Sequence, residues 1–219
     1  MNKIQQRALE AAKIEQKLQE ARLELALHQI KPHFLQNALM SIKVLCRTRP
    51  KEAEQAVYDF AVFLRGNMNA LESAEMIPFR EECKTIERYL HIEKIRFGER
   101  LQVQWDLQEE KFRIPPLTIQ PLVENAVCHG ICQKMEGGTV QIRSFRKNGE
   151  ICVQILDDGA GFDTEKLKDA DGIAIRNLKL RLKEFLNADL EIESRKGEGC
   201  RQTIHIPWEE TDDENYSDR

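Results

Sequence analysis

Long apolar runs are absent from this sequence of 219 residues. The longest, such as residues 60–64, fall far short of the roughly 20 residues that span a bilayer. No charged segment followed by an apolar stretch opens the chain, so no signal peptide is predicted. We therefore expect no membrane-spanning segment and a cytoplasmic location, either alone or as the soluble part of a membrane-tethered receptor.

Cysteines and histidines at the spacing of a zinc site are also missing from the sequence. The six cysteines include no Cys-x-x-Cys pair, and no histidines cluster at the spacing of a zinc site. This distribution favours reduced, structural thiols. Cys128 and Cys132 lie one helical turn apart, which leaves a metal or redox role for that pair as the less favoured alternative.

A strong charge of one sign is also lacking. The net charge is −4, and residues 209–219 hold six acidic residues and one arginine, so the rest of the chain is close to neutral. This balance gives no basic footprint for nucleic acid or for a membrane surface. We expect the acidic end to be a disordered tail.

The first hundred residues have helical composition. Residues 1–30 are rich in Gln, Glu, Lys, Ala and Leu and contain no Gly or Pro, which predicts a long helix that is either a signal-relaying coiled coil or a plain amphipathic helix. Pro32 should bend it just before His33. Further helices are predicted over 51–71 and 79–97, the former closing a hairpin, with Glu81 and Glu82 complementing the dipole of the latter.

From Leu101 onward the pattern changes to alternating apolar and polar residues, which is typical of strands. Two helical stretches, 117–130 and 173–187, interrupt the strands. The mixture indicates an α/β sandwich with a mixed sheet and helices on one face. The strands are predicted over 101–107, 139–145, 151–156, 189–194 and 201–206.

Two segments together predict an ATP pocket. Residues 114–131, IPPLTIQPLVENAVCHGI, carry Glu124 and Asn125, whose oxygens are ligands that Mg²⁺ accepts. Asp157 ends an apolar strand, where its carboxylate can accept a hydrogen bond from the adenine amino group. Gly159 and Gly161 would let the backbone approach the nucleotide. The alternatives are a solvent-facing helix and an ordinary surface turn.

His33 is a candidate nucleophile, because roughly three quarters of an exposed imidazole is neutral at pH 7. Asn37, one turn later, could orient His33 or place a water molecule. The alternative is that His33 is simply a polar residue of a dimer helix.

Five stretches, in order, resemble the LytS-type sensor histidine kinases: 31–37 (KPHFLQN), 89–98 (YLHIEKIRFG), 114–130, 157–162 and 172–182. The ATP module of that family belongs to the superfamily of gyrase, heat-shock chaperones, histidine kinases and MutL. The resemblance implies an α+β chain, in which a helical hairpin for dimerisation precedes an α/β sandwich of this GHKL, or Bergerat, type.

The resemblance also implies segments and residue roles. The segments are a signalling helix (1–30), a dimerisation and phosphotransfer region (31–98), an ATP-binding domain (99–208) and the acidic tail (209–219). His33 becomes the phosphoacceptor, Asn125 the Mg²⁺ ligand and Glu124 its assistant, while residues 162–171 form a lid. The remaining implied pocket residues are His129, Gly172, Arg176, Asn177 and Gly199. A solvated basic face shared with Lys179, Arg181 and Lys183 explains Arg176 about as well.

Three positions depart from the family pattern. Cys128 replaces a usual lysine, Ala174 a glycine and Cys200 a threonine. Loss of the lysine removes a phosphate contact, and the methyl group of Ala174 restricts the backbone. Both changes predict weakened ATP binding.

The sequence thus predicts the cytosolic core of a sensor histidine kinase. A homodimer would bind ATP and Mg²⁺, phosphorylate His33 and pass the phosphoryl group to an aspartate of a response regulator. Two alternatives stay open. One is a degenerate, non-catalytic interaction protein, favoured by the three departures. The other is an anti-sigma-type protein kinase, against which the segment 31–37 argues.

Overall fold

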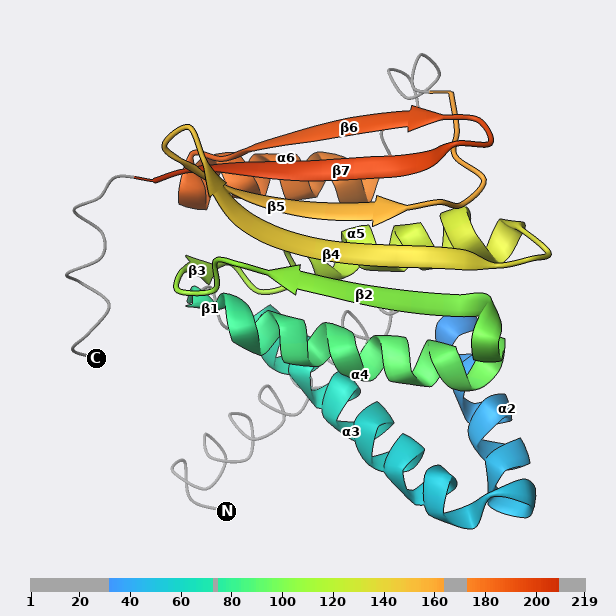
Figure 1. Ribbon diagram of the computed structural model, residues 1–219. Helices are drawn as coiled ribbons and strands as arrows, with labels where there is room; N and C mark the ends of the chain where they lie inside the picture. The colour runs from blue at the N-terminus through green and yellow to red at the C-terminus, as the bar shows by residue number, and fades with distance from the viewer. Residues whose placement is uncertain (1–31, 73–74, 164–172, 209–219) are drawn as a thin grey trace, which may run out of the picture. The chain divides into compact units, whose positions relative to one another are not determined.

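The structure is a computed structural model that describes residues 32–72, 75–163 and 173–208 (Figure 1). The helix predicted for residues 1–30 lies outside these residues, as do most of the predicted lid, Gly172 and the acidic tail. The chain divides into two compact units, Met1–Ala74 and Glu75–Arg219. None of the helices in the described ranges is long and apolar enough to cross a membrane.

The first unit contains a helical hairpin. Helix α2 spans Pro32–Thr48 and helix α3 spans Pro50–Glu72, and each begins at a proline, whose fixed φ suits the first turn. Apolar residues three or four apart are buried between the helices, and the ring of Phe34 packs edge-on to that of Phe63 at 5.3 Å between centroids. The predicted hairpin is therefore confirmed.

The second unit is built on a five-stranded sheet with the order β2-β4-β5-β7-β6. Strands β2 and β4 are parallel, whereas the other neighbours are antiparallel, so the sheet is mixed as predicted. The strands span Leu101–Leu107 (β2), Gly138–Lys147 (β4), Glu150–Asp157 (β5), Asp189–Arg195 (β6) and Gly199–Pro207 (β7). A separate small ladder pairs Ile77–Pro78 (β1) with Arg113–Ile114 (β3).

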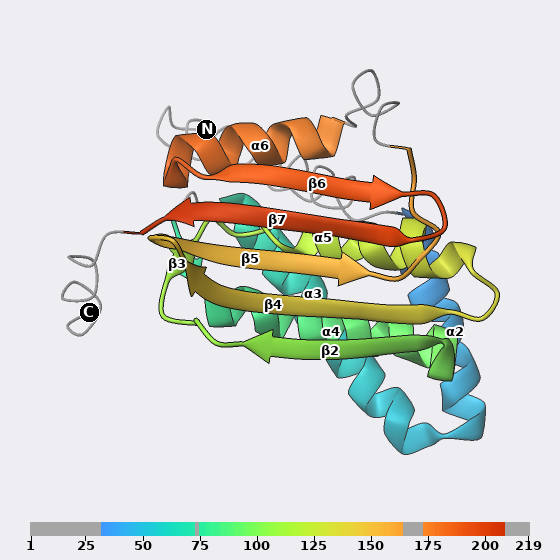
Figure 2. The same ribbon diagram turned by 45° about the horizontal axis from the view of Figure 1, so that its top comes forward.

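Three helices cover one face of this sheet: α4 (Phe79–Phe97), α5 (Gln120–Asn125) and α6 (Ile173–Leu186) (Figures 1 and 2). On the strands, the side chains of Val140, Ile142, Ile155 and Ile204 are fully buried and belong to the core. Alternate positions carry Gln, Arg and Glu, as expected for a sheet whose other face meets water. The predicted two-layer sandwich is confirmed.

The helix predicted over 117–130 starts later and changes its pitch. Leu117 has a φ of 58°, which no α-helix permits, so α5 begins only at Gln120. A π-helical turn, Ala126–Gly130, follows, and a 3₁₀ turn, Ile131–Gln133, ends the segment. The sequence pattern gave no sign of either change, because the apolar periodicity continues through both.

Glu82 has a role beyond the predicted one. It is 2% exposed, and its Oε1 accepts hydrogen bonds from the backbone N–H groups of Ile119, at 2.5 Å, and Gln120, at 3.0 Å. The carboxylate therefore caps the start of α5, although Glu82 also lies in the first turn of α4 as predicted. Burial raises the pKa of Glu82 to about 7, against the opposing effects of these N–H groups and the charge of Arg181.

The raised pKa makes stability depend on pH. The pKa of Glu82 in the folded protein, about 7, exceeds the ordinary value of 4.5, so the folded state binds this proton more tightly. Its stabilising effect is complete below the ordinary pKa and is lost as the pH rises through about 7. Between about pH 5.5 and 8, we expect the wild type to lose about 2 kcal/mol of unfolding free energy relative to Glu82→Gln, measured by urea denaturation.

Glu81→Gln is the matched control, because Glu81 lies in the same helical turn but is exposed and forms an exposed ion pair with Lys84, at 2.7 Å. An exposed pair of this kind is worth less than about 1 kcal/mol, and we expect the pH profile of this variant to follow that of the wild type. A Glu82→Gln profile parallel to that of the wild type would disprove the assignment.

Candidate nucleotide-binding site

Asp157 closes strand β5 with a buried carboxylate. It is 8% exposed, and its Oδ1 accepts a hydrogen bond from the backbone N–H of Gly159 at 3.0 Å. A Cβ added to Gly130 would lie 2.4 Å from the same oxygen. The end of the π-helical turn therefore packs directly on Asp157, and a side chain at position 130 would displace the carboxylate.

Burial raises the pKa of Asp157 to about 6, and the neighbouring charge of Asp158 adds to the increase. The N–H groups of Gly159 and Cys200 and the charge of Lys134 oppose it. The group is thus ionised at neutral pH while largely withdrawn from water. Such a carboxylate is a strong and selective acceptor for an amino group of a bound base.

The turn after Asp157 is braced on three sides. The Oδ1 of Asp158 accepts from the N–H of Thr139 at 2.7 Å, and its carbonyl accepts from Nζ of Lys134 at 2.9 Å. Ala160 donates its N–H to the carbonyl of Gly130 at 3.1 Å, and its own carbonyl accepts from the N–H of Gly197 at 2.7 Å. This is a fixed platform rather than an ordinary surface turn.

The two predicted glycines of this turn meet protein backbone. A Cβ on Gly159 would lie 2.2 Å from the carbonyl carbon of Gly130, and one on Gly161 would lie 2.0 Å from the carbonyl oxygen of Arg195. Gly161 also has a φ of 58°. Chain packing alone therefore requires both glycines, whatever they contribute to a ligand.

Gly199 and Cys200 lie on the strand opposite Asp157. Gly199 has a φ of 86°, and a Cβ there would lie 1.9 Å from the carbonyl oxygen of Asp157. Cys200 is the register partner of Asp157, and burial raises the pKa of its thiol to about 12, so the thiol is neutral. The hydroxyl of Ser194 donates to the carbonyl of Gly199 at 2.8 Å and accepts from the N–H of Phe162 at 2.9 Å. Ser194 thus fixes the corner of the sheet formed by Asp157, Gly199 and Cys200.

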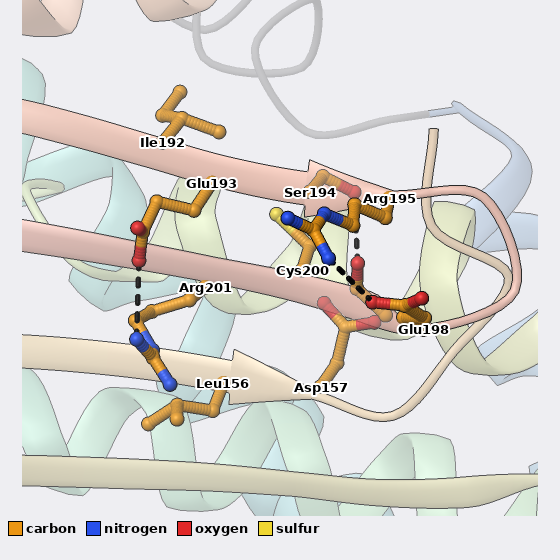
Figure 3. Close-up of a pocket in the computed structure, with 10 residues that line it drawn as sticks. Leu156, Asp157, Ile192, Glu193, Ser194, Arg195, Glu198, Cys200 and Arg201 are labelled. Carbon is orange, nitrogen blue, oxygen red and sulfur yellow. Dashed lines mark hydrogen bonds and ion pairs between the residues drawn. The ribbon is translucent and has the colours of Figure 1, made fainter. Parts of the chain in front are cut away.

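A cavity of about 580 Å³ opens beside this corner (Figure 3). Ion pairs between Arg195 and Glu198, at 3.7 Å, and between Arg201 and Glu193, at 3.1 Å, flank it. The lining residues are Leu156, Asp157, Ile192, Glu193, Ser194, Arg195, Glu198, Gly199, Cys200 and Arg201. The cavity thus includes Asp157 but none of the residues predicted on α5 and the π-helical turn.

Those residues lie along the segment that reaches Asp157 through Gly130. Glu124 is half-buried and accepts from Nε2 of Gln120 at 2.9 Å, and Asn125 is half-buried where the π-helical turn begins. His129 is exposed. The side chains of Glu124 and Asn125 offer the hard oxygen atoms that Mg²⁺ takes, so the donor set fits this ion.

Helix α6 holds two exposed predicted residues and one half-buried arginine. Arg176 and Asn177 are exposed, and Gly172 lies outside the described residues. Arg181 is half-buried, its Nη2 donates to the carbonyl of Leu117, and Glu82 supplies the neighbouring negative charge. The interpretation of Arg181 as part of a solvated basic face was wrong for this residue.

His33 and Asn37 meet in the first turns of α2. The side-chain nitrogen of Asn37 lies 3.0 Å from Nδ1 and 3.1 Å from Nε2 of His33. The imidazole is exposed. The spacing of four residues thus places the amide against the ring, in a position to orient it.

Sequence reasoning missed Glu82, Gly130 and Lys134 as parts of this site. Gly130 was visible only as the last residue of a motif, and its necessity depends on the approach of a strand 27 residues later. Lys134 and Glu82 act through backbone groups of distant segments, for which local sequence carries no signal.

Two family models match the chain. The model described as "Histidine kinase" covers residues 21–101, and the model described as "Histidine kinase-, DNA gyrase B-, and HSP90-like ATPase" covers residues 116–210. Together they include His33 and every residue predicted for the nucleotide pocket.

Similar proteins include one uncharacterized protein of comparable length and two much longer sensor proteins. The putative uncharacterized protein YwpD of Bacillus subtilis is 36% identical over 88% of this chain and 73% of its own length. Sensor protein LytS of Bacillus cereus and sensor histidine kinase BtsS of Escherichia coli are 31% and 32% identical over 87% of this chain. This chain covers only 34% of the length of each of these two proteins.

Among solved structures, the histidine kinase domain of a blue-light activated histidine kinase from Erythrobacter litoralis has the same fold. It matches 85% of this chain and 93% of its own chain with a TM-score of 0.50 and 18% identity. The family models and the named relatives confirm the resemblance inferred from the sequence motifs. The chain belongs to the LytS-type sensor histidine kinases and joins a histidine kinase region to an ATPase domain of the gyrase B and HSP90 type.

Proposed function

We propose that this chain is the kinase core of a two-component sensor, which phosphorylates His33 from ATP and passes the phosphoryl group to an aspartate of a response regulator. The observation that carries the proposal is the buried, ionised carboxylate of Asp157, held against Gly130 and Gly159 inside an ATPase-type domain. It supplies the base recognition that ATP needs.

Adenine recognition is assigned to Asp157. The exocyclic amino group of adenine donates to the carboxylate, whereas guanine carries a carbonyl at that position and would face repulsion. The contacts of Asp157 with Gly159 and Gly130 fix the carboxylate before the ligand arrives. Gly199 is required by the same packing, and the exposed Arg176, Asn177 and His129 are assigned to the phosphate side of the pocket.

Asn125, with Glu124 beside it, would hold Mg²⁺ together with the phosphate oxygens. When bound, the ion neutralises phosphate charge. Gln120 keeps the carboxylate of Glu124 in place through the 2.9 Å hydrogen bond, and the cap by Glu82 fixes where α5 begins. These residues orient the γ-phosphate for transfer.

His33 provides the nucleophile. A ring nitrogen of the neutral imidazole uses its lone pair to form a bond to the γ-phosphorus, while the bond from that phosphorus to the β–γ bridging oxygen breaks. ADP leaves with the bond electrons, and the proton on the other ring nitrogen passes to solvent. Asn37, 3.0 Å from Nδ1, restricts rotation of the ring, which matters because phosphoryl transfer depends mainly on positioning.

A homodimer is proposed on the apolar surface of the hairpin. Helices α2 and α3 expose Leu39, Met40, Val44, Val57 and Tyr58, each more than half accessible to solvent. A surface of this kind favours association with a second copy. Because ATP is the proposed substrate, we place the chain in the cytoplasm, where a response regulator would receive the phosphoryl group from His33.

The nucleophile can be identified by labelling. We expect γ-labelled ATP with Mg²⁺ to label the wild-type chain with acid-labile, base-stable phosphate, and His33→Ala to lose at least about 95% of the label, because no other nitrogen would be positioned for transfer. The measurement is label per chain after gel separation, with acid and alkali treatment of parallel samples.

His91→Ala is the matched control, because His91 is also an exposed helical histidine, on α4, and its label should equal that of the wild type. Label that persists in His33→Ala would refute the assignment of the nucleophile. ATP binding without any label would refute the catalytic proposal and favour the non-catalytic alternative.

The adenine contact predicts a pH-dependent affinity. Asp157→Asn should weaken ATP binding by about 10- to 100-fold, the range expected for losing a hydrogen bond to a charged group. Because the pKa of Asp157 is raised to about 6, its charge is lost as the pH falls through that value. Wild-type affinity, measured by calorimetry, should therefore fall between about pH 7.5 and 5.5, whereas that of the variant should change little.

Asp158→Asn serves as the comparison, because Asp158 is the exposed neighbouring carboxylate and an amide oxygen can still accept from the N–H of Thr139. We expect its affinity for ATP to stay within about threefold of the wild-type value, since an exposed charge is screened. Equal affinities for Asp157→Asn and the wild type at pH 7.5 would exclude the adenine contact.

A further inference from the structure

A cluster of metal-binding side chains lies away from the nucleotide site, across strands β5 and β7. Cys152 and His205 are register partners, so their side chains emerge on the same side of the sheet. The Sγ of Cys152 lies 3.9 Å from Nδ1 of His205, and Oε2 of Glu150 lies 3.0 Å from the same nitrogen. One ligand atom from each of these three residues lies within 4.8 Å of the others.

Two of these separations are close to those around a tetrahedral zinc ion. Ligands held 2.0–2.3 Å from zinc lie about 3.3–3.6 Å from one another. The contact of sulfur with nitrogen is a few tenths of an ångström longer, and that of oxygen with nitrogen is a few tenths shorter. The three ligand atoms lie within 4.8 Å of one another, so side-chain rotation would have to bring the sulfur and the carboxylate oxygen together around the ion, with a water molecule in the fourth position.

The second nitrogen of His205 is also engaged. Its Nε2 lies 3.4 Å from Oε2 of Glu191, which comes from the neighbouring strand β6. An imidazole that gives Nδ1 to a metal carries its proton on Nε2, and a carboxylate there fixes the ring and increases its basicity. The cluster thus has ligands and an orienting group.

A surface ion pair would explain part of this arrangement. His205 and Glu150 are 33% and 41% exposed at their side chains, as in many weak exposed pairs. It would not explain why a thiol that is buried and free of any disulfide also faces the imidazole nitrogen. Nor does it account for the second carboxylate on the other side of the ring.

We propose that Glu150, Cys152 and His205 bind one divalent cation of the zinc class on the outer face of the sheet. Binding forms a bond from the thiolate sulfur to the metal, and the thiol proton passes to solvent. The thiolate and imidazole ligands favour Zn²⁺ over Mg²⁺, so this site differs in chemistry from the site proposed at Asn125.

The metal site and Asp157 lie at opposite ends of the same pair of strands. Cys152 precedes Asp157 by five residues on β5, and His205 follows Cys200 by five on β7, which corresponds to about 17 Å. In Figure 1, the end of β5 that carries the proposed metal site is the end next to the β4–β5 hairpin, opposite the arrowhead of β5. A bound ion would join β5 to β7 without touching the nucleotide.

The test uses the full chain, freed of metal by a chelator and kept reduced, in the absence of nucleotide. Calorimetric titration with Zn²⁺ should show one site per chain, and His205→Gln should weaken it by at least about tenfold. Titration with Co²⁺ should give a thiolate-to-cobalt charge-transfer band in the near ultraviolet, which Cys152→Ser should abolish.

Cys46→Ser and His91→Gln are the matched controls, because they remove an exposed cysteine and an exposed histidine elsewhere, and both should bind Zn²⁺ as the wild type does. Zn²⁺ should also raise the melting temperature of the wild type but not of His205→Gln, which separates metal binding from a folding defect. Absence of saturable binding, or binding unchanged in both Cys152→Ser and His205→Gln, would overturn the proposal.

Discussion

The carboxylate of Glu82 determines where the helix of the candidate site begins. It is a side chain of α4, yet it accepts hydrogen bonds from the N–H groups of Ile119 and Gln120 at the start of α5. Arg181 of α6 completes the junction by donating to the carbonyl of Leu117 while its charge faces Glu82. Glu82 and Arg181 thus connect the three helices that cover the sheet through contacts with residues 117–120, and the start of α5 depends on them. Since α5 has only six residues, a shift of one residue at its start would rotate Asn125 and move Gly130 away from Asp157.

This junction is expensive in free energy. The second oxygen of Glu82 and the Nε of Arg181 are buried without a hydrogen-bond partner among the described residues, and each such atom costs about 1–3 kcal/mol. An apolar pair would pack there more cheaply but could not hold the unpaired N–H groups before α5. The polar junction therefore selects one conformation of the segment from Leu117 onward. It does so in the region where Leu117 already has an unfavourable positive φ.

Helices and strands that are marked by a local residue pattern could be predicted from the sequence, whereas contacts between distant segments could not. Alternation placed β2 at Leu101–Leu107, and proline with apolar periodicity placed the hairpin and α4. The family motifs predicted His33, Asn125 and Asp157 as site residues, because their neighbours in sequence carry the pattern. Nothing local marked Glu82 as a cap, because its position in the first turn of α4 already had a sufficient explanation. The pairing of Cys152 with His205 was equally invisible, since zinc sites are recognised by short spacings and these residues are 53 apart.

The register of β5 against β7 links the two ends of the sheet. Side chains alternate between the faces of a strand, so a slip of one residue would turn Cys152 away from His205 and remove Gly199 from the carbonyl of Asp157. Gly199 enforces the register, because any other residue at that position would collide with the backbone of Asp157. The close approach that shapes the proposed adenine site at Asp157 therefore also sets the alignment on which the proposed metal site depends. Conversely, an ion bound by Cys152 and His205 would oppose any slip and so hold Asp157 opposite Cys200. The two sites are separate in chemistry but share one mechanical constraint, which is the pairing of these two strands.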